Sequence, residues 1–384
     1  MAETLQQAKA KGITVHLHQA TVTDARLNQQ PDQRLILTAT AQNRQTQIAV
    51  DALVLATGNR ARRPAFLPQV NEAGAHFVAD VWQPQPAGLY PHRVADLGPD
   101  AEIVIVGTGL TMVDAVLTLQ AHGYLGSITA ISRHGWVPAV HAHGKPYPAW
   151  AWTLDPETAP QTALGLFQGL RAEIAHAATL GYDWRSVIDS LRPVTQTLWK
   201  RLDNGEKRKF LRRLFTVWNV HRHRMAHEVH DQLVALQQAG RLKLVAGKVC
   251  QITPTADGLT LAYRPGHSAA SVTVHAALVL NCTGPAYDST DEEGLLANLR
   301  HRELITLGPL AIGVETDAQG SAKGKVPGVI YPLGSLLVGE LLECTAVPEL
   351  REQAKAVADQ VLARLAQPVA VPVATWPVRE LTLA

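Results

Sequence analysis

The sequence has few cysteines and no long apolar run. Only three of its 384 residues are cysteines, Cys250, Cys282 and Cys344, and no two of them form a Cys-x-x-Cys pair. This spacing excludes a dithiol redox pair of close neighbours and is typical of a reducing compartment. No apolar segment approaches the roughly 18 residues that a membrane span needs, and the opening residues are too polar for a signal peptide. We therefore expect a cytoplasmic protein that does not span a membrane.

Neither positive nor negative charge predominates over the whole chain. The net charge is +2, with 18% charged and 46% hydrophobic residues, a composition that supports a sizeable core in two or three domains. One segment, residues 185–224, carries eleven lysines and arginines against three carboxylates. Because Trp184, Trp199 and Trp218 interleave with these charges, the segment indicates amphipathic helices with a solvated basic face. We expect no nucleic-acid partner.

Patterning divides the chain into strand-rich ends and a helical middle. Short strands are predicted between residues 13 and 50, followed by an apolar strand over 52–58 that is typical of a buried parallel sheet. Helices are predicted from about 159 to 239, and further strands from 242 to 274. A second apolar strand over 277–285 repeats the pattern of the first, because both end in Thr-Gly.

A glycine loop at residues 107–109 has the surroundings of a dinucleotide-binding site. An apolar strand over 102–106 runs into Gly107-Thr108-Gly109, and Leu110-Thr111 open a helix. Such glycines let the backbone approach a pyrophosphate, and the first helix amides face the anion. The third motif position holds Met112 in place of a small residue, which predicts looser helix–strand packing. The alternative is a glycine turn that binds no ligand.

The end of the next strand indicates which dinucleotide is bound. A strand over 128–132 ends in Ser132-Arg133, about 20 residues past the glycines, where an acidic residue would select NADH. No carboxylate is present, Arg133 can grip a 2′-phosphate bidentately, and Ser132 can donate a hydroxyl hydrogen bond. The sequence therefore favours NADPH. The alternative is that Arg133 is a solvated residue at the strand end.

Histidines are frequent between residues 221 and 230. His223, His227 and His230 can share one helix face, but a metal site needs three or four suitable ligands, and the flanking arginines oppose a cation. We expect no metal. The same residues, with His141 and His143, remain candidates for a helix surface or for contacts with an anion.

The paired Thr-Gly strands carry a resemblance to a known family. Leu55-Ala56-Thr57-Gly58-Asn59 and Asn281-Cys282-Thr283-Gly284-Pro285 flank the nucleotide unit, and they resemble the exit from and return to a split FAD domain. Together with Ser-Arg-His-Gly at 132–135, the stretch at 218–224 and the closing segments 328–334 and 343–354, they resemble the bacterial FAD/NAD(P)-binding oxidoreductases. That family is grouped with FAD-dependent urate hydroxylases and, more distantly, with flavin monooxygenases.

The resemblance implies an α/β two-dinucleotide-binding flavoprotein fold, in which an NAD(P)H domain with a helical segment interrupts the FAD domain. It implies a partial FAD domain over 1–65, a connection over 66–100, an NAD(P)-binding unit over 101–150, a helical segment over 151–240 and a return to the FAD domain over 241–384. It also implies FAD as a second cofactor, with the flavin ring lined by Thr57, Gly58, Thr283, Gly284, Gly334 and Thr345. A helix N-terminus near residue 347 would face the flavin pyrimidine and stabilise negative charge there.

One departure from the family qualifies this expectation. Members begin with their own strand–Gly-x-Gly-x-x-Gly–helix, which holds the ADP half of FAD, and this sequence has no such element. We therefore expect a truncated chain or a vestigial flavin site. The leading hypothesis is a flavin-dependent, NADPH-linked oxidoreductase acting on a small molecule, with no acid–base residue assignable. The alternative is a non-catalytic NADP(H)-binding remnant without stable flavin.

Overall fold

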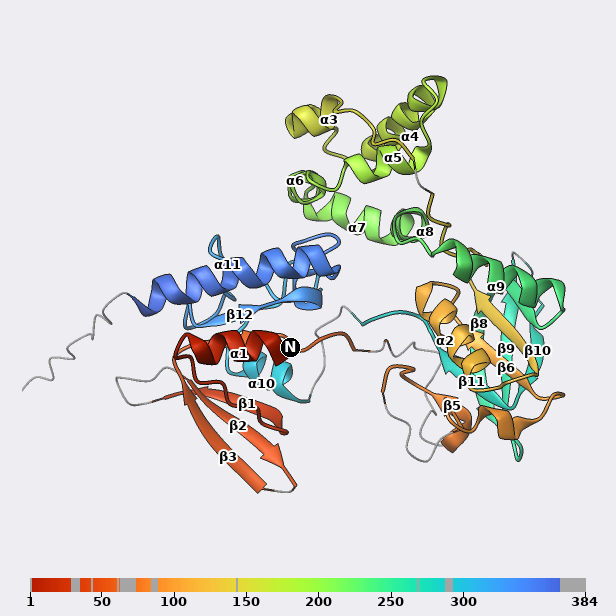
Figure 1. Cartoon of the computed structure of the whole chain (residues 1–384), viewed down its shortest axis with the longest axis horizontal. Coiled ribbons are helices and arrows are strands. Elements are labelled where there is room, and N and C mark those ends of the chain that lie inside the picture. Colours follow the sequence, from red (N-terminus) through yellow and green to blue (C-terminus); the bar gives the residue numbers. More distant parts are fainter. Residues whose placement is uncertain are drawn as a thin grey trace, which may run out of the picture. The chain divides into compact units, whose positions relative to one another are not determined.

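The structure, a computed structural model, divides the chain into two compact units (Figure 1). It describes residues 2–28, 35–42, 44–60, 62, 74–83, 89–142, 144–266, 268, 270–286 and 293–366. Unit 1 comprises residues 1–57 and 288–384, and unit 2 comprises residues 58–287. The chain thus leaves unit 1 at the first Thr-Gly turn and returns to it shortly after the second.

Unit 2 is organised around a seven-stranded mixed sheet with the order β10-β9-β8-β7-β6-β11-β5. Its parallel part contains β5 (Phe77–Val78), β6 (Glu102–Val106), β7 (Ser127–Ser132), β11 (Leu278–Asn281) and the first half of β8 (Leu242–Pro254). The second half of β8 continues into an antiparallel meander with β9 (Leu259–Pro265) and β10 (Val272–Ala276). The carboxyl ends of β6, β7 and β11 therefore meet at one edge of the sheet.

Strand β6 is buried on both faces, and alternate residues enter two different cores. Ile103 and Ile105 pack with helix α2 (Leu110–Ala121) and helix α9 (His227–Gln238). Val104 and Val106 point the other way, into a core formed with β8 and β9. Because side chains alternate across a strand, this apolar run needs cover on both sides, as the sequence predicts.

The helical segment of unit 2 lies between β7 and α9 in the sequence. It contains α3 (Ala151–Leu154), η4 (Pro156–Thr158), α4 (Ala163–Thr179), α5 (Trp184–Ser190), α6 (Thr195–Arg201), α7 (Asn204–Arg213) and α8 (Phe215–Arg222). Carboxylate and hydroxyl side chains cap several of these helices; for example, Asp203 accepts a hydrogen bond from the Glu206 amide at 2.8 Å. A small core around Trp152 and Leu198 holds the segment together.

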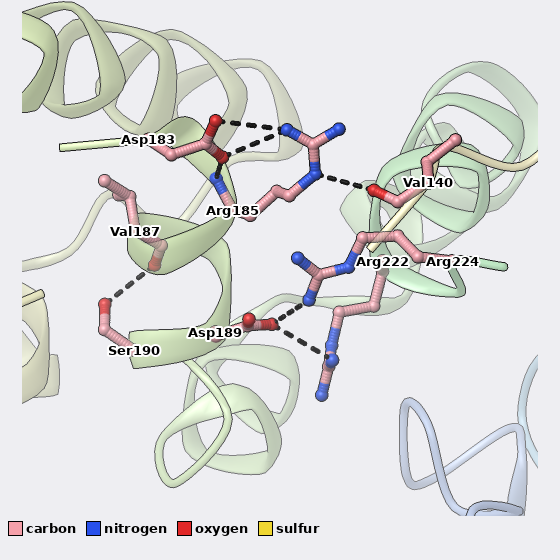
Figure 2. A network of polar contacts seen from close by, with 8 residues as sticks. All are labelled: Val140, Asp183, Arg185, Val187, Asp189, Ser190, Arg222 and Arg224. Atoms are coloured by element: carbon pink, nitrogen blue, oxygen red, sulfur yellow. Dashed lines mark hydrogen bonds and ion pairs between the residues drawn. The ribbon is translucent and has the colours of Figure 1, made fainter. Parts of the chain in front are cut away.

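A hydrogen bond joins this segment to the residues that follow β7, and ion pairs connect residues between 183 and 224 (Figure 2). Arg185 pairs with Asp183 at 3.1 Å and donates from Nε to the Val140 carbonyl at 2.7 Å. Asp189 accepts from both Arg222 and Arg224. These three arginine side chains are only 3–19% exposed. Part of the basic run at 185–224 therefore points inward to carboxylates and does not form a solvated stripe.

Unit 1 has two small sheets and a core of its own. Strands β1 (Thr21–Leu27), β2 (Leu35–Ala41) and β3 (Arg44–Val50) form an antiparallel meander. Strands β4 (Leu53–Leu55) and β12 (Ile330–Pro332) form a parallel pair. Helix α10 (Leu295–His301) lies against β1, where Asn298 donates to the Thr23 carbonyl at 2.9 Å. The unit also contains α1 (Ala2–Ala10) and α11 (Val347–Leu365).

The domain boundary differs from the expectation of a return to the FAD domain at residue 241. Strands β8 to β11 hydrogen-bond into the same sheet as β6 and β7, so unit 2 extends to residue 287. The expected connection over 66–100 also contributes the edge strand β5 to that sheet, while residues 66–73 and 84–88 lie outside the described residues. Parallel pairing joins segments far apart in sequence, so local patterning could not assign these strands to a unit.

The strand predicted at Ile13–Leu17 is also absent. Ile13, Val15 and Leu17 are 54%, 37% and 76% exposed, and no strand in the described part of the chain pairs with them. An alternating apolar pattern forms a strand only when a neighbouring strand satisfies its backbone. Among the described helices, none combines the length and the apolar character needed to cross a membrane.

Candidate functional site

The glycine loop lies at the carboxyl end of β6, and Gly107 is required there by its backbone contacts. Its φ is +114°, and a Cβ at this position would lie 2.1 Å from the Cys282 carbonyl oxygen. The Gly107 amide donates to the Ile131 carbonyl at 2.8 Å, and the Cys282 amide donates to the Val106 carbonyl at 2.8 Å. The loop is therefore held tightly between the ends of β7 and β11.

Gly109 has the opposite surroundings. It is the N-cap of α2, it is exposed, and a Cβ built there would meet no atom within 4 Å. Leu110 and Thr111 occupy the first helical positions, whose amides have no carbonyl partner within the helix. An exposed, unobstructed helix N-terminus with a favourable dipole is suited to an anion such as a pyrophosphate.

Met112 does not loosen the packing of α2 against the sheet, contrary to the prediction from the motif. Its side chain is fully buried in the core that also contains Ile103 and Ile105. A flexible thioether side chain can fill an irregular space where a smaller residue would leave a void. Met112 therefore contributes to the core between α2 and the sheet.

Three residues around the loop share a chain of hydrogen bonds. Thr108 is 4% exposed, its Oγ1 donates to the Trp136 carbonyl, and it lies 2.7 Å from the Ser132 Oγ. Because a carbonyl can only accept, the Thr108 proton is used, and Ser132 must donate its own proton to Thr108. The Ser132 Oγ in turn accepts from the Gly135 amide at 3.0 Å.

The assignment of these two hydroxyl protons changes the expected role of Ser132. Its single proton already serves Thr108, so Ser132 can offer a ligand only an acceptor lone pair while the network is intact. A phosphate oxygen is itself a hydrogen-bond acceptor, so it cannot form a hydrogen bond with that lone pair. Arg133, which follows Ser132, is the neighbouring residue with side-chain donors.

Arg133, the residue that the NADPH hypothesis assigns to the 2′-phosphate, lies at the end of β7. It follows β7 directly and is exposed, and within the part of the chain that the structure describes its guanidinium makes no hydrogen bond or ion pair. A guanidinium with unused donors near a helix N-terminus can bind a phosphate through two parallel hydrogen bonds. His134 and Trp136, on either side of Gly135, stack with ring centroids 4.5 Å apart and an interplanar angle of 22°.

Asn281, which the sequence indicates only as part of the second Thr-Gly motif, links that motif to the segment that follows Gly58. Its side-chain amide donates to the Arg62 and Ala79 carbonyls at 2.8 and 2.9 Å, and its oxygen accepts from the Thr283 amide and hydroxyl. The Arg62 amide also donates to the Gly284 carbonyl at 3.1 Å. The segments that follow Gly58 and Thr283 therefore run side by side. A polar residue inside an otherwise apolar strand was the available signal.

Thr57 and Gly58 are both exposed, and Gly58 has a φ of +72° with open space beside it. Nothing in their local geometry obstructs a ligand. Thr57 belongs to unit 1 and Gly58 to unit 2, so they mark the point at which the chain passes between the units.

Gly334 and Thr345 lie in unit 1, near the start of α11. The Gly334 amide donates to the Gln353 Oε1 at 2.9 Å, and the Gly334 carbonyl accepts from the Cys344 thiol at 3.1 Å. Gln353 also donates to the Cys344 carbonyl at 2.8 Å, while Thr345 is exposed. Both backbone groups of Gly334 thus have partners within the protein, and Thr345 is the more open of the two residues.

The three cysteines are free thiols. Burial raises the pKa of the Cys282 thiol to about 12, with a smaller contribution from the Asp114 carboxylate. Burial likewise raises the pKa of the Cys344 thiol to about 12. Since the thiolate is the nucleophile in thiol chemistry, these two residues are structural.

The histidine-rich segment spans the end of one helix and the start of the next. His221 lies on α8, His227 and His230 lie on α9, and the His230 Nδ1 is 3.4 Å from the Asp231 Oδ1. The described residues contain no group of three or more histidine, cysteine or carboxylate side chains that could hold a metal ion. His141 donates its backbone amide to the Met225 carbonyl, and His143 lies outside the described residues.

Comparison with known proteins finds similarity in structure and not in sequence. No family model and no curated protein sequence matches the chain. The structure is similar to ornithine hydroxylase from Pseudomonas aeruginosa in its reduced form, with a TM-score of 0.61, 15% identity, and coverage of 94% of this chain and 74% of that one.

Two further solved structures are of the same kind. The ornithine N-hydroxylase of Kutzneria sp. 744, with FADred, NADP+ and L-orn, gives a TM-score of 0.59 at 15% identity and covers 95% of this chain and 76% of that one. L-lysine 6-monooxygenase from Pseudomonas syringae gives 0.56 at 13% identity, with 91% and 71% covered. At such identities the likeness is one of fold. The chain has the two-dinucleotide-binding flavoprotein fold, as the family resemblance implies.

Proposed function

We propose that this chain is an NADPH-linked, FAD-dependent oxidoreductase of a monooxygenase-like kind that acts on a small molecule. The observation that carries the proposal is the glycine loop of unit 2. There Gly107 admits no side chain, Gly109 has open space beside it, and Arg133 is exposed. All three lie at the carboxyl ends of neighbouring parallel strands. This is the position at which dinucleotides bind in such sheets.

Each residue of the loop has a separate task in binding NADPH. The exposed turn at Gly109 and the amides of Leu110 and Thr111 receive the pyrophosphate. Arg133 receives the 2′-phosphate and so distinguishes NADPH from NADH. Thr108 and Ser132 do not contact the phosphate in this proposal; their mutual hydrogen bond holds the glycine loop against the end of β7.

The flavin half of the proposal is supported by the shared fold, since the similar ornithine N-hydroxylase was solved with FADred and NADP+. When bound, FAD would accept a hydride from NADPH and pass electrons to oxygen or another acceptor. Within the described residues, unit 1 offers Thr57, Thr345 and the N-terminus of α11 near a flavin ring, but no strand–glycine–helix cradle for a pyrophosphate. We therefore derive no catalytic step through the flavin from these residues. The finer resemblance, to the group that includes FAD-dependent urate hydroxylases, is also part of this proposal.

The test separates the two cofactors. The purified chain, with and without added FAD, is examined by visible spectroscopy and titrated anaerobically with NADPH, and oxygen is then admitted. Flavin absorbance that NADPH bleaches and oxygen restores is the expected result, and Arg133→Ala, at an exposed position, is the variant that should need more NADPH for the same bleaching. NADPH binding without flavin absorbance, even with FAD added, would instead support the non-catalytic remnant. A chain that binds neither cofactor would refute the proposal.

A further inference from the structure

Two aromatic rings lie stacked and solvent-exposed immediately after Arg133, and the proposed function has not used them. Trp136 is 45% exposed and His134 is also exposed, although their rings are 4.5 Å apart at only 22°. Each ring of a stacked pair retains one outer face. A large flat apolar surface of this kind, held next to a phosphate-binding residue, has the form of a platform for an aromatic base.

The platform is fixed to the glycine loop through its backbone. The Trp136 carbonyl accepts from the buried Thr108 hydroxyl, and Gly135 donates its amide to Ser132. Gly135 has a φ of +64°, and a Cβ there would lie 3.1 Å from the Ala246 amide nitrogen, so the turn is tightly packed as well as hydrogen-bonded. The rings are therefore carried by a backbone whose position relative to Gly107–Gly109 is set by side-chain hydrogen bonds.

The order of sites along the chain matches the order of groups along the nucleotide. In an adenine dinucleotide the pyrophosphate is followed by the ribose with its 2′-substituent and then by the base. Here Thr108 of the glycine loop is hydrogen-bonded to Ser132 and to the Trp136 carbonyl, so the turn that carries Arg133 and the ring pair adjoins the pyrophosphate loop. The adenine is the group that extends beyond the ribose, so a dinucleotide held at the loop and at Arg133 would direct its base toward the turn that carries His134 and Trp136.

We propose that the His134–Trp136 pair is the adenine-stacking platform of the dinucleotide site, and that Thr108 is the positioning residue that holds it. The inference rests on the proposed NADPH site and adds to it a purine-binding surface. Arg133 supplies selectivity for the 2′-phosphate, and the ring pair supplies affinity for the base regardless of whether that phosphate is present. NADH and NADPH should therefore be affected equally by the loss of Trp136, and unequally by the loss of Arg133.

The experiment uses the full chain and 2′,5′-ADP, which contains the base and both phosphates but no nicotinamide, so that binding is measured without flavin or turnover. Affinities of wild type, Trp136→Leu and His134→Ala are compared by calorimetry. Trp82→Leu is the matched control, since Trp82 is another exposed tryptophan of unit 2, at 66%. Trp136→Leu should weaken 2′,5′-ADP by about tenfold, as expected for the loss of one base–aromatic stack, while Trp82→Leu should have no effect.

Thr108 is tested by a pair of substitutions. Thr108→Ser keeps the hydroxyl and should retain wild-type affinity, whereas Thr108→Val removes it and should weaken 2′,5′-ADP. Because the rings would then be less well held, the quenching of Trp136 fluorescence by the ligand should also decrease, which a purely structural role in stability would not require. If Thr108→Val weakens 2′,5′-ADP binding and Thr108→Ser does not, the positioning role is supported.

The outcomes distinguish this inference from the function on which it rests. If 2′,5′-ADP and NADPH bind to Trp136→Leu and His134→Ala as tightly as to wild type, the proposed stacking platform is wrong and the NADPH site stands. If neither ligand binds wild type, the proposed NADPH site itself is wrong. If Trp136→Leu weakens NADPH and not NADH, the rings act through the 2′-phosphate and the stacking assignment is overturned.

Discussion

Gly107 in unit 2 and Gly334 in unit 1 occupy similar places, since each follows the carboxyl end of a buried strand that pairs in parallel with a neighbouring strand. Both have positive φ, +114° and +64°, and each lies beside a buried cysteine. They differ in whether the backbone groups around them already have hydrogen-bond partners. The loop at Gly107 leads to an open helix N-terminus at Gly109, whereas both backbone groups of Gly334 are bonded to Gln353 and Cys344.

The comparison shows that a glycine after a strand does not by itself make a binding site. The same backbone conformation serves a ligand when the following amides are left without partners, and serves the fold when side chains occupy them. On this basis we propose the nucleotide loop in unit 2, whereas the Gly334 turn is a clamp that is hydrogen-bonded to α11 through Gln353. Four predictions test this distinction.

Gly107→Ala should have the largest effect. A Cβ would lie 2.1 Å from the Cys282 carbonyl oxygen at a φ that disfavours side chains, so we expect at least about 3 kcal/mol of lost stability and no measurable NADPH binding. Denaturant unfolding and calorimetry measure the two effects. Gly109→Ala is the matched control, because its Cβ meets nothing in the protein; it should keep the stability and still weaken NADPH. A stable Gly107→Ala protein that binds NADPH would contradict the close packing of this loop.

Arg133→Ala should have the next largest effect, and only on one nucleotide. Loss of charge-assisted hydrogen bonds to a phosphate, worth about 2 kcal/mol, corresponds to roughly 30-fold weaker NADPH binding. NADH affinity should not change, and Arg133→Lys, which keeps the charge but not the bidentate geometry, should lie between the two. Equal losses for NADPH and NADH would show that Arg133 does not read the 2′-phosphate.

The sequence alone predicts those parts of the site that are formed by consecutive residues. The strand over 102–106, the glycine loop and the helix from Leu110 follow from consecutive residues, and the structure places all of them within a residue or two of the prediction. The contact of Thr108 with the Trp136 carbonyl joins residues 28 apart, so no local pattern indicates it. The role of Asn281 likewise depends on Arg62, which is 219 residues away.

The same reasoning explains the errors. The pattern at Ile13–Leu17 met every local criterion for a strand, but pairing is a property of two segments and no described partner is present. Ser132 was expected to donate to a phosphate because its residue type and position allow it. Only the structure shows that its proton is already shared with Thr108.

Gln353→Leu tests the clamp in unit 1. The substitution keeps most of the side-chain volume and removes the hydrogen bonds to the Gly334 amide and the Cys344 carbonyl. We expect about 2 kcal/mol of lost stability, since each bond contributes about 1 kcal/mol and its backbone partner is left unsatisfied. NADPH affinity should equal that of wild type. A change in NADPH affinity would show that the two glycine turns are not independent.

The two buried cysteines report separately on the two turns. Burial raises the pKa of Cys282 and of Cys344 to about 12, so at pH 8 both thiols are protonated in the folded chain and react with an alkylating reagent only when their unit opens. A ligand at about ten times its Kd stabilises the unit that binds it by about 1.4 kcal/mol. In dilute urea, 2′,5′-ADP should therefore slow alkylation of Cys282, beside Gly107, by about tenfold, and leave that of Cys344, beside Gly334, unchanged. Peptide mass mapping over time measures both rates in one sample, and equal protection of the two thiols would mean that the units open together or that the nucleotide binds both.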